Sequence, residues 1–170
     1  MSRYLCIMNY FDLFGIPITL KVDKSILAKK YFELQRQFHP DFYTQSDESE
    51  QQAALEKSAQ INKGLKVLQQ QDATIQYVLK LRGLVSEDEK YSLPPDFLME
   101  MMELNEKLEE QDPETFTKEL AQLEDTLHEQ VKDIIENYHN DSISGEKLEK
   151  LKEYYFKKKY LKRILDRIAD

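Results

Sequence analysis

The chain has 170 residues, 41% of them hydrophobic, and a formal net charge of −8. That length fits one domain or two small ones, and the negative charge argues against nucleic acid as the main partner. The apolar runs fall far short of the roughly 18 residues that a membrane span requires, so we expect no membrane partner.

The N-terminal residues 1–8 have the pattern of neither a secretory signal nor an Arg- and Ser-rich transit peptide. The single cysteine, Cys6, has no partner for an internal disulfide, and a lone thiol suits a reducing compartment. We therefore expect a cytoplasmic protein, although a mature organelle protein would have the same features.

The chain contains four Gly and five Pro, and the segments between them have helical rather than alternating periodicity. The first half predicts helices over residues 9–15, 24–38, 48–70 and 72–82. Gly15 suits the C-cap of the first helix and Asp23 the N-cap of the second. The inward-facing residues expected in the two long helices are Ile26, Leu27, Tyr31, Leu34 and Phe38, and then Ala54, Leu55, Ser58, Ile61, Leu65 and Leu68.

The second half follows a loop-like, acidic stretch from Leu84 to Pro95 and predicts helices over 95–110, 113–139 and about 145–168. Asp112 and Pro113 fit the N-cap and the first helical position of the middle helix. Three amphipathic helices with short connections form an antiparallel bundle. We therefore predict an all-α protein with an N-terminal helical domain over 1–75, a connecting helix and linker over 76–94, and a three-helix bundle over 95–170.

The tripeptide His39-Pro40-Asp41 stands directly after the helix over 24–38. Pro40 ends that helix, because the residue before a proline avoids the α conformation, and it stiffens the corner from which His39 and Asp41 project. Taken alone, the tripeptide could equally be a helix-ending turn, since Pro and Asp are common turn residues. The preceding helix carries cationic side chains that could steer a negatively charged partner, namely Lys24, Lys29, Lys30 and Arg36.

The setting of this tripeptide resembles the J domain, and the resemblance covers residues 9–70. A short helix ending in Asp12-Leu13-Phe14-Gly15 precedes the basic helix, and a long helix with Ala59-Gln60-Ile61-Asn62 follows it. The two long helices would then form a hairpin stem that holds the corner. The resemblance implies stimulation of a DnaK-type ATPase through a chaperone-binding surface made of His39, Pro40, Asp41, Lys29, Lys30 and Arg36.

Further segments look like one branch, the HscB-type co-chaperones of iron–sulfur cluster assembly. These segments are residues 11–17, residues 34–41 and Phe97-Leu98-Met99-Glu100. The resemblance implies an L-shaped molecule, with a J domain and a three-helix bundle, that delivers an IscU-like scaffold protein to HscA or to a general DnaK-type chaperone. One departure is Phe42, which stands where the family usually has Lys.

In the helix over 95–110, a core stripe at i, i+4, i+7 and i+11 is formed by Phe97, Met101, Leu104 and Leu108. Three further apolar residues fall outside this stripe, and methionine is common at binding surfaces. They would either pack against the rest of the protein or bind a partner. The family resemblance implies a scaffold-binding surface made of Leu98, Met99, Met102, Glu103, Glu106 and, from the last helix, Tyr155.

Nothing in the sequence indicates an enzyme, a metal site or a cofactor. His128 and His139 have no cysteine partners and no recognisable metal-ligand spacing. Neither a phosphate-binding glycine loop nor a nucleophile with its base is evident. Two alternatives stay open, a J-domain protein with a different client and a helical interaction module with a degenerate J domain, for which Phe42 is the only support.

Overall fold

The computed structural model describes residues 8–86, 89–110 and 112–169, and it gives the backbone alone for 108–110, 113, 168 and 169. Regular structure within these residues is entirely helical, which confirms the predicted fold class. The chain divides into two compact units, Met1–Val78 and Leu79–Asp170, at a point inside α4 (Gln71–Leu81). Cys6 and the predicted core side chain of Leu108 lie outside the described parts, and the three-part functional division stays a prediction.

The short helix α1 (Tyr10–Phe14) is capped by Asn9 at its N-terminus and by Gly15 at its C-terminus. The Asn9 side chain accepts a hydrogen bond from the backbone N–H of Asp12 at 3.0 Å. Gly15 adopts a left-handed conformation with φ of 62°, and its N–H donates to the Asp12 carbonyl. A residue without Cβ adopts this conformation without strain, so Gly15 is the predicted C-cap.

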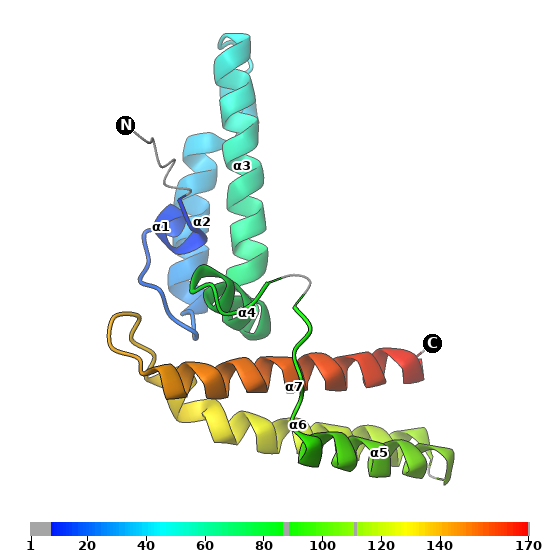
Figure 1. Ribbon diagram of the computed structural model, residues 1–170. Coiled ribbons are helices and arrows are strands. Elements are labelled where there is room, and N and C mark those ends of the chain that lie inside the picture. The colour runs from blue at the N-terminus through cyan, green and yellow to red at the C-terminus, as the bar shows by residue number, and fades with distance from the viewer. Residues whose placement is uncertain (1–7, 87–88, 111, 170) are drawn as a thin grey trace. The chain divides into compact units, whose positions relative to one another are not determined.

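The first unit is built on a hairpin of α2 (Lys24–Phe38) and α3 (Glu48–Leu68), which lie side by side in Figure 1. Asp23 caps α2, and its carboxylate accepts the N–H groups of Ile26 and Ser25, which lower the pKa of this carboxyl. Across the hairpin, the Tyr31 hydroxyl and the Gln35 amide both donate to the side-chain oxygen of Asn62. These two hydrogen bonds therefore link α2 to α3 beside the apolar core of the hairpin.

The core of this unit is made of one stripe from each long helix together with the rings of α1. Fully buried side chains include Phe11, Phe14, Leu27 and Ile61. The predictions that Ile26 and Leu55 face the core are wrong, because both are about half exposed. Each lies about 100° around its helix from a buried neighbour, Leu27 or Ala54, and the narrow contact between two helices does not reach that far.

Gly64 of α3 lies where α1 packs most closely against the hairpin. A Cβ atom at this position would lie 2.8 Å from a ring carbon of Phe14 and 3.0 Å from one of Tyr10. The Tyr10 ring in turn stacks on Tyr77 of α4 with 4.7 Å between ring centroids. The absence of a side chain at Gly64 therefore allows α1 to dock on α3.

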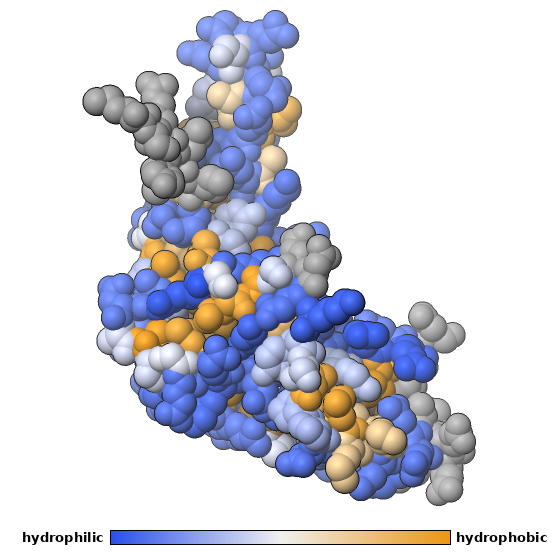
Figure 2. Space-filling model, viewed as in Figure 1, coloured by the Kyte–Doolittle hydropathy of each residue, from blue (hydrophilic) through white to orange (hydrophobic). Residues whose placement is uncertain are grey.

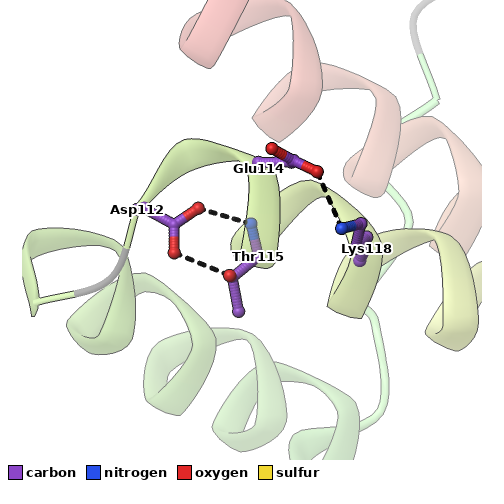
Figure 3. Close-up of polar contacts among 4 residues, drawn as sticks. All are labelled: Asp112, Glu114, Thr115 and Lys118. Carbon is purple, nitrogen blue, oxygen red and sulfur yellow. Dashed lines mark hydrogen bonds and ion pairs between the residues drawn. The ribbon is translucent and has the colours of Figure 1, made fainter.

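The second unit contains the predicted bundle, formed by α5 (Pro95–Glu110), α6 (Pro113–Glu136) and α7 (Gly145–Ala169). Figure 3 shows the start of α6, where the Asp112 carboxylate accepts both the N–H and the hydroxyl of Thr115. Thr115 thereby lowers the pKa of Asp112, and Lys118 pairs with Glu114 one turn later. Buried residues along α6 and α7 include Phe116, Leu120, Val131, Leu151 and Leu161.

The segment that leads into α5 is fixed to α7 by two contacts. The ammonium group of Lys152 lies 2.6 Å from the Glu89 carboxylate, and its hydrogen bond lowers the pKa of Glu89. The rings of Tyr91 and Phe156 stack almost in parallel, with centroids 4.3 Å apart. This loop-like segment therefore belongs to the packed body of the second unit.

Candidate protein-binding surfaces

The loop after α2 presents the His39-Pro40-Asp41 tripeptide to solvent. It begins a short 3-10 helix, η1 (Pro40–Tyr43), and His39 is its N-cap. The ring nitrogen Nδ1 of His39 accepts the N–H of Asp41 at 3.3 Å and lies 3.6 Å from the Asp41 carboxylate. Both side chains are exposed, so the tripeptide is ordered by its own contacts while its polar groups face outward.

Two side chains tie this loop to the helices on either side of it. The Tyr43 hydroxyl donates to the Gln37 carbonyl at 2.9 Å, near the end of α2. The Gln51 amide, one turn into α3, donates to the Ser46 carbonyl at 2.9 Å. Sequence reasoning missed both contacts. They fasten the loop at each end and leave the residues between them in a defined conformation.

The three cationic residues predicted to bind a partner lie on α2, where Lys29 and Arg36 are exposed and Lys30 pairs with Glu33 at 3.3 Å. Phe32 lies between them and is 65% exposed. Residues at i, i+3 and i+7 share one side of a helix, so Lys29, Phe32 and Arg36 form a single basic surface with an aromatic ring at its middle. The pattern of charges predicted the basic residues of this surface, but it did not predict the exposed ring of Phe32.

The first turns of α5 carry a second exposed surface, which we call the α5 surface and define as Leu98, Met99, Met102, Glu103 and Glu106. Figure 2 shows apolar side chains gathered over α5, where Leu98 is 37% and Met102 is 64% exposed. The neighbouring stripe of Phe97, Met101 and Leu104 is buried, as the helical spacing predicted. The apolar residues outside the stripe are thus available to a partner, with carboxylates beside them.

Tyr155, the remaining residue predicted for scaffold binding, is half-buried on α7, and its ring centroid lies 5.0 Å from that of Phe156. Two other residues of α7 lie against the first turn of α5. The Tyr160 ring meets Phe97 edge-on at 6.0 Å, and the Lys157 ammonium lies 5.4 Å from the same ring. Tyr160 and Lys157 therefore pack on the buried stripe of α5 at Phe97, and neither contact was predictable from the sequence.

The described part of the chain contains neither a cluster of metal-ligating side chains nor a helix able to span a membrane. The described residues contain no cluster of three or more His, Cys, Asp or Glu side chains that could hold a metal ion. His128 contacts the Tyr154 hydroxyl at 3.2 Å, which is a structural contact between α6 and α7. Across the described helices, none combines the length and the apolar character needed to cross a bilayer.

Comparison with known proteins relates the whole chain to one family. Residues 93–169 match the family model described as the HSCB C-terminal oligomerisation domain. A Vibrio parahaemolyticus protein named co-chaperone protein HscB homolog is 32% identical over 168 residues, which cover 96% of this chain and 98% of that protein.

Two solved structures agree with this assignment. The crystal structure of human co-chaperone protein HscB matches with a TM-score of 0.78 and 29% identity, covering 96% of this chain and 82% of that one. Chaperone HscB from Vibrio cholerae matches with a TM-score of 0.62 and 30% identity, over 95% of this chain and 99% of that one. The arrangement of a J domain and a C-terminal bundle is thus shared along nearly the full length, and the chain belongs to the HscB family of co-chaperone proteins.

Proposed function

We propose that this co-chaperone stimulates ATP hydrolysis by a DnaK/HscA-type chaperone and delivers an IscU-like scaffold protein to it for iron–sulfur cluster transfer. The observation that carries the proposal is the pair of exposed surfaces, one basic with an ordered His39-Pro40-Asp41 loop and one apolar and acidic on α5. Each unit would bind its own partner, in the cytoplasm, and the hydrolysis would take place in the chaperone.

The loop and the basic surface are suited to an acidic partner. Lys29 and Arg36 can raise the rate of encounter with a negatively charged protein. The contacts of Tyr43 and Gln51 hold the loop before binding, so less conformational entropy is lost when the partner docks. The Asp41 carboxylate, exposed beside His39, can then accept hydrogen bonds from the chaperone.

The α5 surface is suited to a partner that offers apolar and basic groups. Leu98 and Met102 can be buried on binding, and unbranched methionine adapts to irregular partner surfaces. Glu103 and Glu106 are exposed beside them and can pair with Lys or Arg of the scaffold. Scaffold binding at this surface would bring the cargo to the chaperone while the loop triggers hydrolysis.

A binding titration separates this proposal from a co-chaperone with a different client. We expect Leu98→Ala/Met102→Ala to weaken binding of an IscU-like scaffold by at least about tenfold, since the few central residues that dominate an interface each cost more than about 1 kcal/mol when truncated to Ala. Leu81→Ala is the matched control, because Leu81 is 43% exposed on α4 and lies outside the α5 surface. Equal affinity of all three proteins would indicate another client or another binding surface.

A second experiment tests the loop and the alternative of a degenerate J domain. We expect His39→Gln to abolish stimulation of the chaperone ATPase while leaving scaffold affinity unchanged, because the His39 ring lies at the surface of the first unit. If wild type and His39→Gln were equally inactive, the chain would be a helical interaction module without an active J domain.

A further inference from the structure

Phe42, the residue after the tripeptide, holds its ring out into solvent. It is 69% exposed, more than any other large apolar side chain in the described part of the chain. Single exposed apolar residues are common on protein surfaces and need no explanation by themselves. Phe42 differs from such residues because it is fixed within the loop that we propose docks on the chaperone.

The rings of Phe42 and His39 form one aromatic pair. Their centroids are 6.0 Å apart, and the ring planes meet at 66° in an edge-to-face arrangement. The backbone adds a second link, because the N–H of Phe42 donates to the His39 carbonyl at 3.0 Å. Contact with Phe42 therefore also orients the imidazole of His39.

The neighbouring residue keeps this pair facing outward. Tyr43 points back to α2, where its hydroxyl binds the Gln37 carbonyl. Because consecutive residues of the short helix η1 point in different directions, anchoring Tyr43 leaves Phe42 on the solvent side. The aromatic pair is thus held ready before any partner arrives.

The charge of the loop indicates what this pair can bind. Residues 39–47 contain Asp41 and Asp47 and no Lys or Arg, so the loop itself offers a partner no permanent positive charge. The cationic side chains lie on α2, at Lys29 and Arg36. A partner site that complements these features is apolar where it meets the Phe42 ring, offers hydrogen-bond donors to Asp41, and is acidic where it meets α2.

We propose that Phe42 and His39 together fill an apolar site on the DnaK-type chaperone, with acidic groups of the chaperone around it facing α2. The proposal rests on the proposed function, because it names the chemistry by which the same loop is recognised. It makes Phe42 a specificity-determining contact: where a Lys would attract the chaperone by charge, Phe42 binds by burial of its ring.

The test uses the full-length protein and the cognate DnaK-type chaperone, with ATPase stimulation measured over a range of co-chaperone concentrations. We expect Phe42→Ser to raise the half-saturating concentration at least about tenfold, which corresponds to about 1.4 kcal/mol. Leu81→Ser is the control, since Leu81 is 43% exposed on α4 and lies outside the loop and the basic surface of α2. This control should stay within about twofold of wild type.

Phe42→Lys adds a readout that a loss of structure would not reproduce. We expect its half-saturating concentration to rise more steeply with salt than that of wild type, because a charge contact is screened and an apolar contact is not. If Phe42→Ser had the same half-saturating concentration as wild type while His39→Gln abolished stimulation, the inference would be overturned and the proposed function would stand. Equal losses for Phe42→Ser and Leu81→Ser, or equal salt dependence of wild type and Phe42→Lys, would also overturn the inference. Failure of wild type itself to stimulate would instead refute the proposed function.

Discussion

The tie between Tyr43 and α2 leads to a quantitative prediction for Tyr43→Phe. This change removes the hydroxyl that binds the Gln37 carbonyl at 2.9 Å and keeps the ring. The carbonyl is near the end of α2, where Pro40 lacks the N–H that would continue the helical hydrogen bonds. A neutral hydrogen bond of this kind contributes about 0.5–1.5 kcal/mol.

The hydrogen bond stabilises the conformation of the loop. We therefore expect its loss to weaken the affinity for the chaperone more than it lowers the free energy of unfolding. In the variant, the loop must be ordered when the chaperone docks, so binding loses the free energy that the hydrogen bond contributed. This loss corresponds to a rise of roughly two- to tenfold in the half-saturating concentration for ATPase stimulation. The maximal stimulated rate should stay near that of wild type, because His39 and Asp41 are unchanged. The assay is a titration of the co-chaperone against the chaperone under single-turnover conditions.

Tyr31→Phe is the matched control for this experiment. Its hydroxyl also makes one hydrogen bond, at 3.1 Å to Asn62, but on the hairpin stem. We expect this variant to lose a little thermal stability and to keep its half-saturating concentration. If Tyr43→Phe stimulated the chaperone as wild type does, or if both variants weakened docking equally, the Tyr43 hydroxyl would have no specific role in docking.

Two further predictions concern stability. Gly64→Val places a side chain against Phe14 and should destabilise the first unit by about 1–3 kcal/mol in urea unfolding. Gly145→Ala is the control, because a Cβ at Gly145 has no atom within 4 Å, and it should leave stability unchanged. Equal effects of the two variants would contradict the close approach of α1 to α3. The hydrogen bond from Lys152 lowers the pKa of Glu89 in the folded protein below its ordinary value of 4.5. The contact therefore stabilises the folded state fully at a pH above 4.5, and this stabilisation is lost as Glu89 becomes protonated in the folded protein at lower pH. The difference in melting temperature between wild type and Glu89→Gln should therefore narrow as the pH is lowered below 4.5. A difference that stays constant with pH would count against the ion pair.

Helix boundaries were predictable wherever a single residue type determines them. Asp23 and Pro40 delimit α2, and Pro95 begins α5, at the positions predicted from the sequence. The sequence predicts that α6 ends at residue 139, whereas the helix ends at Glu136. Asn137 leaves the helical conformation there, and no Pro or Gly marks the place, so the sequence carries no strong signal for it.

The candidate surfaces were predictable only in part. Helical spacing separated the buried stripe of α5 from Leu98 and Met102, and the tripeptide identified the loop. The contacts of Tyr43 and Gln51 were not predictable, because each joins a side chain to a backbone carbonyl whose position depends on the folded loop. Phe32 was missed for a different reason. Aromatic residues are usually buried, and the exposure of a single ring depends on which side of the helix packs.

We propose that a single chain couples scaffold binding to ATP hydrolysis by the chaperone. The measurement that tests it most directly is the steady-state ATPase rate of the cognate DnaK-type chaperone with this protein, with an IscU-like scaffold, and with both, repeated with Leu98→Ala/Met102→Ala. We expect the two proteins together to stimulate more than the sum of their separate effects, and the variant to lose that synergy while keeping the scaffold-independent stimulation. Stimulation that does not depend on the scaffold would contradict the coupling, and no stimulation under any condition would contradict the account as a whole.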